Sequence, residues 1–368
     1  MRTLISMTLI AFLHLSMSTN ANATEIDLAQ HFSSYSEESP LEMDFSVVNE
    51  MLHAGVIYMG YSTRKLSERP KEIFGTRFRH YKDRATENEA NRFFYESLVK
   101  QQQEIDLLKQ SLELIPEQTP LNLYSKEEQL AYWLNLYNVS LINEVAKIYP
   151  KYDLQEYLYG EQSILENKII TVNNIKLSLN DIQYNILQKN YDNDPLIIYG
   201  LYQGNIGGPN IRRKAYTGYN VYKSLADNAF EFINSNRGTQ FNGEDGEVRI
   251  SQFYQRNESF FPDFENDLKQ HLLTYAKKTI SENIQTASSF NANIKNWKIA
   301  DLYGSKRKIR PSAGTQSINE AVDNELYTKN MRLLELMRIR AVNLGGGSVT
   351  VTDIETDDED ELPEVNDN

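Results

Sequence analysis

A glycine-rich loop at residues 203–210 contains the polar side chains best placed to contact a ligand. It reads Gln-Gly-Asn-Ile-Gly-Gly-Pro-Asn, and its glycines allow backbone angles that other residues rarely adopt. Gln203 and Asn205 offer both donors and acceptors, and Gly208 adds backbone freedom. No Lys-Ser or Lys-Thr pair follows, so the loop does not match a phosphate-binding loop. We predict that Gln203, Asn205 and Gly208 contribute to a binding site.

Two further amides, Asn135 and Asn138, lie within a strongly apolar segment. A buried amide needs partners for most of its hydrogen-bonding groups. One interpretation is that the pair faces a ligand pocket. The other, which we favour, is that each amide bridges its helix to neighbouring backbone. We keep both residues as candidate binding residues.

Familiar catalytic constellations are missing from the sequence. It contains no cysteine, which excludes disulfides, thiol nucleophiles and iron–sulfur clusters. The histidines beyond residue 23 are His31, His53, His80 and His271, and no two have the spacing of a zinc-binding helix. There is no Gly-x-Ser-x-Gly elbow and no dinucleotide glycine pattern. We therefore predict no catalytic residue, no metal site and no cofactor.

The elements that position these residues start with a long helix predicted over 126–148. Ser125 and Glu128 have the spacing of a capping box, in which each side chain binds the other's backbone amide. Apolar residues then recur at helical spacing, from Leu130 and Trp133 to Ile148, and they also fill the opposite side. A helix that is apolar almost all round is buried by several neighbours. This pattern predicts the central helix of the main domain.

A small set of elements follows the central helix. Asn-Asn at 173–174, between apolar segments at 168–172 and 175–177, predicts a hairpin with a two-residue loop. Ser178 and Asp181 predict the start of a helix over 179–189. The β-rich apolar run at 196–202 predicts a buried strand leading into the glycine-rich loop. A further helix is predicted over 219–234.

Taken together, these segments resemble the bacterial branch of the domain of unknown function 547 family. The resemblance rests on Glu-Gln-Leu-Ala-Tyr-Trp-Leu-Asn-Leu-Tyr-Asn at 128–138, Leu-Ser-Leu-Asn-Asp-Ile at 177–182, and Asp-Pro at 194–195 before the Gly-Pro loop. It covers about 125–235, with a weaker similarity at 296–301. The resemblance implies a fold and a family name, because this family has no agreed activity.

The chain departs from the resembled pattern where members commonly carry reactive side chains. Tyr184 and Tyr199 stand at positions where members often have His, and Gln203 and Gly208 where members often have Cys. A Cys/His pair is the usual minimum for thiol chemistry. Tyrosine combines a flat apolar face with a polar tip, which suits a sugar or peptide. We predict that Tyr184 and Tyr199 lie beneath the 203–210 loop and bind rather than react, unless they simply fill the space.

Regions on both sides of the family-like segment read as mainly helical. Apolar spacing predicts helices over 43–58 and 87–114, with Pro116 and Pro120 breaking the chain before Ser125. Downstream, the pattern predicts a short strand at 248–250 and a helix over 263–283. Several Arg and Lys residues between 64 and 84 predict a basic loop, either a site for an anionic surface or, as we favour, a solvated face.

Composition and the two ends of the chain suggest a secreted globular protein. Arg2, the apolar residues 4–17 and Ala-Asn-Ala at 21–23 predict a signal peptide with a mature start at Thr24. The 368 residues carry 51 acids and 38 bases, and nine of the acids lie in 353–368, which we predict to be a disordered tail. Nothing in the overall charge, which is acidic, suggests a nucleic-acid partner, and no transmembrane segment is expected.

The predicted fold class is α+β, mostly helical, with a small β-sheet built around a buried central helix. The predicted plan is a signal peptide at 1–23, an N-terminal helical region at 24–120, the main family-like domain at 121–310, a C-terminal helix at 311–344, and a Gly-rich linker with acidic tail at 345–368. The expected function is a periplasmic, non-catalytic binding or scaffold protein for a small molecule, glycan or peptide. The alternative is a thiol-independent hydrolase or transferase that uses carboxylate or Tyr chemistry in the same cleft.

Overall fold

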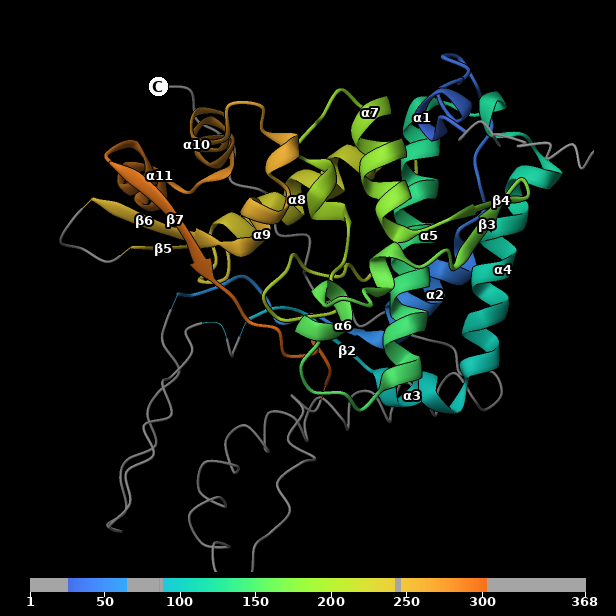
Figure 1. The fold of residues 1–368 in the computed structure, drawn as a ribbon, viewed down its shortest axis with the longest axis horizontal. Helices are drawn as coiled ribbons and strands as arrows, with labels where there is room; N and C mark the ends of the chain where they lie inside the picture. The colour runs from blue at the N-terminus through green and yellow to red at the C-terminus, as the bar shows by residue number, and fades with distance from the viewer. Residues whose placement is uncertain (1–25, 65–85, 87–88, 242–245, 303–368) are drawn as a thin grey trace, which may run out of the picture.

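The computed structural model describes residues 26–64, 86, 89–241 and 246–302. One half of the described chain is helical and centres on α5, and the other half carries a three-stranded sheet beside α10 and α11 (Figure 1). The α-helices are α1 Leu28–His31, α2 Ser46–Gly55, α3 Tyr95–Lys100, α4 Gln102–Gln118, α5 Lys126–Ile148, α6 Gln155–Tyr159, α7 Gln188–Asn190, α8 Val221–Ile233, α9 Gln252–Arg256, α10 Phe264–Tyr275 and α11 Lys278–Gln285.

Short helical turns and strands complete the described part. The 3-10 turns are η1 Leu121–Leu123, η2 Ile164–Glu166, η4 Ile197–Gly200 and η5 Glu258–Phe260, and η3 Asp181–Leu187 is a π-helix. The strands are β1 Val56–Ile57, β2 Arg92–Phe93, β3 Ile170–Val172, β4 Ile175–Leu177, β5 Thr239–Phe241, β6 Glu247–Ser251 and β7 Ser289–Ile294. β1–β2 and β3–β4 are antiparallel pairs, and β6 pairs antiparallel with β5 and parallel with β7. The mostly helical α+β prediction is confirmed.

The central helix α5 has the predicted bounds, Lys126–Ile148. It packs against α3, α4, η3 and α8, which explains why apolar residues surround it on all sides. The Ser125 hydroxyl accepts from the Glu128 amide at 3.2 Å, as predicted. The predicted return contact, from the Glu128 carboxylate to the Ser125 amide, is wrong. The carboxylate instead accepts from the amides of Met43 at 2.8 Å and Gly218 at 2.6 Å. Glu128 thus ties the helix start to two distant segments.

Asn135 bridges α5 to the segment before α8, and its removal should be costly. It is 1% exposed, donates to the Tyr216 carbonyl at 2.8 Å and accepts from the Tyr216 amide at 3.0 Å. We expect Asn135→Leu to lower the free energy of unfolding by about 1–3 kcal/mol, because both Tyr216 backbone groups lose their partner. Urea denaturation measures this change. Asn283→Leu, on an exposed position of α11, is the control, and an unchanged midpoint in Asn135→Leu would contradict the bridge.

The hairpin and the closing helix follow the sequence prediction. β3 pairs with β4 in register Val172↔Ile175, so Asn173 and Asn174 form the two-residue loop. Their φ angles of 49° and 62° are the positive values that a two-residue turn of this type requires. The predicted helix over 179–189 is present, although its middle is the π-helix η3. α8 Val221–Ile233 agrees with the predicted 219–234.

The predicted strand over 196–202 is wrong, because this run forms the 3-10 turn η4. The preceding Asp-Pro starts a helical turn, since the Asp194 carboxylate accepts from the Leu196 amide at 2.9 Å. The Tyr199 amide then donates to the Leu196 carbonyl at 3.1 Å. Pro195 lies just before the N-cap Leu196 of this turn, where its missing N–H costs no helical hydrogen bond.

Three predicted helices are shorter or interrupted. The 43–58 prediction reduces to α2, which ends at Gly55 before β1. The 87–114 prediction becomes α3 and α4, separated at Gln101, and α4 continues through Pro116 to Gln118, although Pro116 has no N–H to donate to the Leu112 carbonyl. The helix predicted over 263–283 is two helices, α10 and α11, with a break at residues 276–277. Asn234 stabilises this break, because its side chain donates to the Tyr275 carbonyl at 2.8 Å and accepts from the Lys277 amide at 2.7 Å.

Several sequence predictions lie outside the described residues. They are the signal peptide, most of the basic 64–84 segment, the C-terminal helix at 311–344 and the acidic tail. The predicted strand at 248–250 lies within β6. In the part of the chain that is described, no helix combines the length and hydrophobicity needed to cross a bilayer.

Candidate functional site

A pocket of about 360 Å³ opens where α6, η2, η3, α9 and the start of the glycine-rich loop meet. We call it the Arg256 pocket. Its lining includes two predicted site residues, Tyr184 and Gln203, together with Tyr159 and Arg256. The volume lies near the lower end of the roughly 300–1,000 Å³ typical of small-molecule sites. The site is therefore assembled from segments about a hundred residues apart in the chain.

The Arg256 guanidinium rests on an aromatic shelf. Its Cζ lies 4.8 Å from the ring centre of Tyr159 and 4.6 Å from that of Trp297. The two ring centres are only 5.2 Å apart, so the rings adjoin each other and do not sandwich the cation. A guanidinium over aromatic faces is held by cation–π attraction and planar stacking. The shelf thus fixes the position of the positive charge in the pocket.

Gln203 is the hydrogen-bonding partner of this cation. Arg256 Nη2 donates to Gln203 Oε1 at 3.0 Å, and the Tyr159 hydroxyl reaches the same oxygen at 3.4 Å. The Tyr184 hydroxyl donates to the Arg256 carbonyl at 3.2 Å. Gln203 itself is buried. Two residues predicted from sequence therefore meet around one arginine that the sequence did not single out.

Tyr184 cannot serve as a base at neutral pH. Burial, and secondarily the nearby Tyr159, raise the pKa of its phenol to about 12, although Arg256 acts in the opposite direction. The hydroxyl therefore stays protonated and acts as a hydrogen-bond donor.

Two carboxylates also line the Arg256 pocket, Glu161 and Glu166, and both residues are solvent-exposed. Glu166 accepts a hydrogen bond from the Asn180 amide group. Within the described part of the chain, neither carboxylate forms an ion pair with Arg256. The pocket therefore holds opposite charges that do not neutralise each other directly.

The rest of the glycine-rich loop supports Gln203 from behind. Asn205 Nδ2 donates to the Gln203 carbonyl at 3.1 Å. A Cβ atom on Gly208 would lie 3.0 Å from the Gln203 Cβ, so only glycine allows this close approach without displacement. The weakly similar segment 296–301 also packs here, where the Ile206 amide donates to the Lys298 carbonyl at 2.8 Å. Asn205 and Gly208 thus position Gln203 and do not line the pocket.

The other predicted site residues lie outside the Arg256 pocket. Asn138 donates to the Gly200 carbonyl at 2.9 Å and accepts from the Tyr202 amide at 2.9 Å, so it fixes the backbone that leads to Gln203. Asn135 is the backbone bridge described above. Both amides therefore have the bridging role that we favoured from the sequence.

Tyr199 lies in a buried aromatic cluster and not beneath the loop with Tyr184. His271 Nε2 lies 2.9 Å from the Tyr199 hydroxyl, which in turn reaches the Tyr254 hydroxyl at 3.3 Å. Burial lowers the pKa of His271 to about 4, so its imidazole is neutral near pH 7. α10 thus places an imidazole against Tyr199, although the histidines are scattered in sequence.

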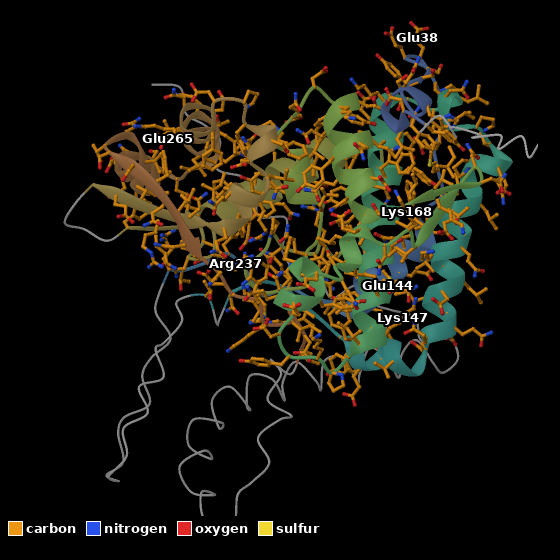
Figure 2. All side chains as sticks on the ribbon, viewed as in Figure 1. Glu38, Glu144, Lys147, Lys168, Arg237 and Glu265 are labelled. Atoms are coloured by element: carbon orange, nitrogen blue, oxygen red, sulfur yellow. The ribbon has the colours of Figure 1, made fainter. Side chains whose placement is uncertain are left out.

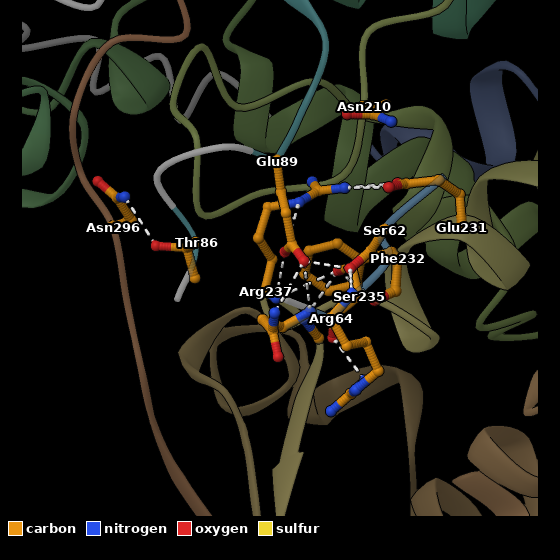
Figure 3. Close-up of polar contacts among 12 residues, drawn as sticks. Ser62, Arg64, Thr86, Glu89, Asn210, Glu231, Phe232, Ser235, Arg237 and Asn296 are labelled. Carbon is orange, nitrogen blue, oxygen red and sulfur yellow. Dashed lines mark hydrogen bonds and ion pairs between the residues drawn. The ribbon is translucent and has the colours of Figure 1, made fainter. Parts of the chain in front are cut away.

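A second polar cluster, buried around Arg237, anchors the far end of the glycine-rich loop. Arg237 Nη1 donates to the Gly208 carbonyl at 2.5 Å, and Nη2 contacts both Glu231 carboxylate oxygens at 2.5 Å. Glu89 accepts from the backbone amides of Asn236 and Arg237, each at 3.1 Å (Figure 3). Arg237 lies inside the molecule, whereas Glu38 and Glu265 lie at its periphery (Figure 2). The cluster stabilises the loop and does not line the Arg256 pocket.

Sequence reasoning missed Arg256, Trp297, His271 and Arg237. Trp297 had a partial signal, because it lies in the weakly similar 296–301 segment. The other three carried no local signal: Arg256 and His271 are single polar residues in short helices, and Arg237 lies in the polar turn 234–238. Among the described residues, no group of three or more His, Asp or Glu side chains is arranged to hold a metal ion.

The fold and site define a mostly helical α+β protein with a small, polar, aromatic-walled pocket. Residues 121–233 match the model of a family described as "Protein of unknown function, DUF547", which supports this family for the segment from η1 to α8. Comparisons with curated proteins and with solved structures give no significant match. The lining residues Arg256 and Asn257 lie beyond the matched residues, so the family segment supplies only part of the pocket.

Proposed function

We propose that the protein is a non-catalytic binding protein that holds a small ligand in the Arg256 pocket. The observation that carries this proposal is the convergence of the Arg256 guanidinium and the Tyr159 hydroxyl on the side-chain oxygen of Gln203 at the pocket wall. Amide, aromatic and cationic groups together can orient a ligand, and most ligand sites use a few such polar groups among apolar walls. None of these three side chains is a useful acid or base near neutral pH.

The positions that differ from the resembled pattern support binding over catalysis. We infer that Gln203 and Tyr184 occupy places where members of the bacterial, secreted branch use Cys and His. A glutamine amide cannot act as a nucleophile in the manner of a thiolate. The signal-like segment at 1–23 supports export, so we propose that the protein works in the periplasm of a Gram-negative bacterium.

The alternative function is a thiol-independent hydrolase or transferase. Glu161 and Glu166 favour it, because they place two carboxylates at the same pocket. Both residues are exposed, whereas a catalytic carboxylic acid usually needs partial burial to keep its proton near neutral pH. We therefore rank this function second.

Screening the purified full chain for stabilisation and for turnover separates the two functions. We expect some small-molecule, glycan or peptide ligands to raise the melting temperature, because a ligand at 100 times its Kd adds about 2.7 kcal/mol of stability. The shift should disappear in Gln203→Ala and persist in Arg249→Gln, a surface arginine on β6 outside the pocket. We expect no hydrolysis of ester, amide or glycoside substrates.

The contrary result would be turnover that depends on the pocket carboxylates. Activity lost in Glu166→Gln but kept in Glu265→Gln, an exposed acid on α10, would establish the enzyme and overturn the non-catalytic function.

A further inference from the structure

The unpaired charges of the Arg256 pocket point to a ligand with charges of its own. Arg256 and the two glutamates line one small cavity, yet no N···O distance of 4.0 Å or less joins Arg256 to either acid in the described part of the chain. Elsewhere the same protein pairs such groups closely, as in Arg237 with Glu231 at 2.5 Å. The separation in the pocket leaves room for a molecule that contacts both signs.

Arg256 is the anion-binding end of this arrangement. Its one side-chain hydrogen bond within the described residues goes to Gln203, and its Nε is buried without a partner there. The aromatic shelf holds the guanidinium plane in place. A weakly hydrated, pre-positioned guanidinium suits a carboxylate, which it can bind through two parallel hydrogen bonds.

The acidic rim supplies the opposite end. Glu161 has no hydrogen bond or ion pair in the described part of the chain, and Glu166 has the Asn180 amide. Two carboxylates beside one arginine make the formal charge of the lining −1, since these are its only charged side chains among the described residues. That balance disfavours a phosphate dianion and favours a ligand that also carries a cation.

We propose that the ligand is a zwitterionic short peptide, with its C-terminal carboxylate on Arg256 and its N-terminal ammonium at Glu161 and Glu166. This inference rests on the proposed binding function. The amide side chains of Gln183, Gln203 and Asn257 line the same cavity and match peptide N–H and C=O groups. About 360 Å³ accommodates two or three small residues, and Tyr159 and Tyr184 offer faces for a side chain.

Isothermal titration of the full chain with tri-alanine and its blocked forms tests the proposal. We expect tri-alanine to bind, and its C-terminal amide and its N-acetyl form each to bind at least about tenfold more weakly, since each loses one charge-assisted contact. Arg256→Gln should weaken tri-alanine at least tenfold but leave the affinity for the C-terminal amide nearly unchanged. The double variant Glu161→Gln with Glu166→Gln should also weaken tri-alanine at least tenfold, but should leave the affinity for the N-acetyl form nearly unchanged. Arg249→Gln is the matched control and should bind like the parent protein.

The outcomes of this titration distinguish failure of the peptide proposal from failure of the proposed binding function. Failure of tri-alanine to bind, or equal affinity for free and blocked peptides, overturns the zwitterion proposal. If a neutral glycan instead binds in a Gln203-dependent manner, the binding function stands and the ligand class is wrong. If tri-alanine is hydrolysed, the non-catalytic function fails, although the charge assignments can still be read from KM in the same variants.

Discussion

Replacing Arg237 with alanine should lower the free energy of unfolding by about 3–5 kcal/mol, because the change leaves a buried carboxylate without its counter-charge. Arg237 is fully buried, and Glu231 is 6% exposed. Burial raises the pKa of Glu231, and the Arg237 guanidinium is the main influence that opposes this rise. Without Arg237, Glu231 must either remain charged in the interior or take up a proton. Chemical denaturation at pH 7 measures the loss.

A double variant shows whether the unpaired charge is the cause. Arg237→Ala with Glu231→Gln should recover part of the lost stability, because the glutamine carries no charge to desolvate. Arg249→Gln, a partly exposed arginine in the sheet, should cost less than about 1 kcal/mol. A loss below about 1 kcal/mol in Arg237→Ala would show that the buried cluster does not stabilise the fold.

The same variant should also disturb the glycine-rich loop. Arg237 holds the Gly208 carbonyl, and Gly208 packs against the Gln203 side chain. Stability and ligand affinity are therefore linked through one loop. Of the 203–210 segment only Gln203 lines the Arg256 pocket, and residues such as Gly208 act by holding Gln203 in place.

Local signals in the sequence were enough to predict the elements that depend on local rules. The bounds of α5 follow from one N-cap serine and an uninterrupted apolar period, and the β3–β4 hairpin follows from two asparagines with positive φ. The run at 196–202 was misassigned because a short apolar stretch does not distinguish a strand from a buried turn. The signal for the turn lies just before this run, where the Asp194 carboxylate accepts from the Leu196 amide.

The site could be predicted only in part, because its geometry depends on contacts between distant segments. Gln203 and Tyr184 were identified from the resemblance and the loop composition. Arg256 and Trp297 reach them through α9 and the 296–301 segment, and nothing near either residue in sequence specifies that contact. The burial of Arg237 could not be predicted for another reason, because a charged residue is expected to be exposed unless a buried partner is known.

Acidification should destabilise the protein through His271. Burial lowers the pKa of this imidazole from 6.5 to about 4 in the folded state. Between these values the unfolded chain binds the proton and the folded chain does not, so stability falls as the pH falls. We expect the loss from His271 to begin near pH 6.5 and to reach about 3 kcal/mol at pH 4, with no contribution above about pH 7.5.

Denaturation of the parent protein and of His271→Gln across pH 4–8 isolates this contribution from that of other groups. Carboxylates titrate in the same range, and Glu231, with its raised pKa, acts in the opposite direction by gaining relative stability as the pH falls. The difference between the two proteins removes these shared terms. His271→Gln should be less stable at pH 7, because it loses packing against Tyr199 and Phe261, yet should have a flatter pH dependence below 6.5. Parallel pH profiles for the two proteins would mean that the imidazole is protonated as easily in the folded chain as in the unfolded one.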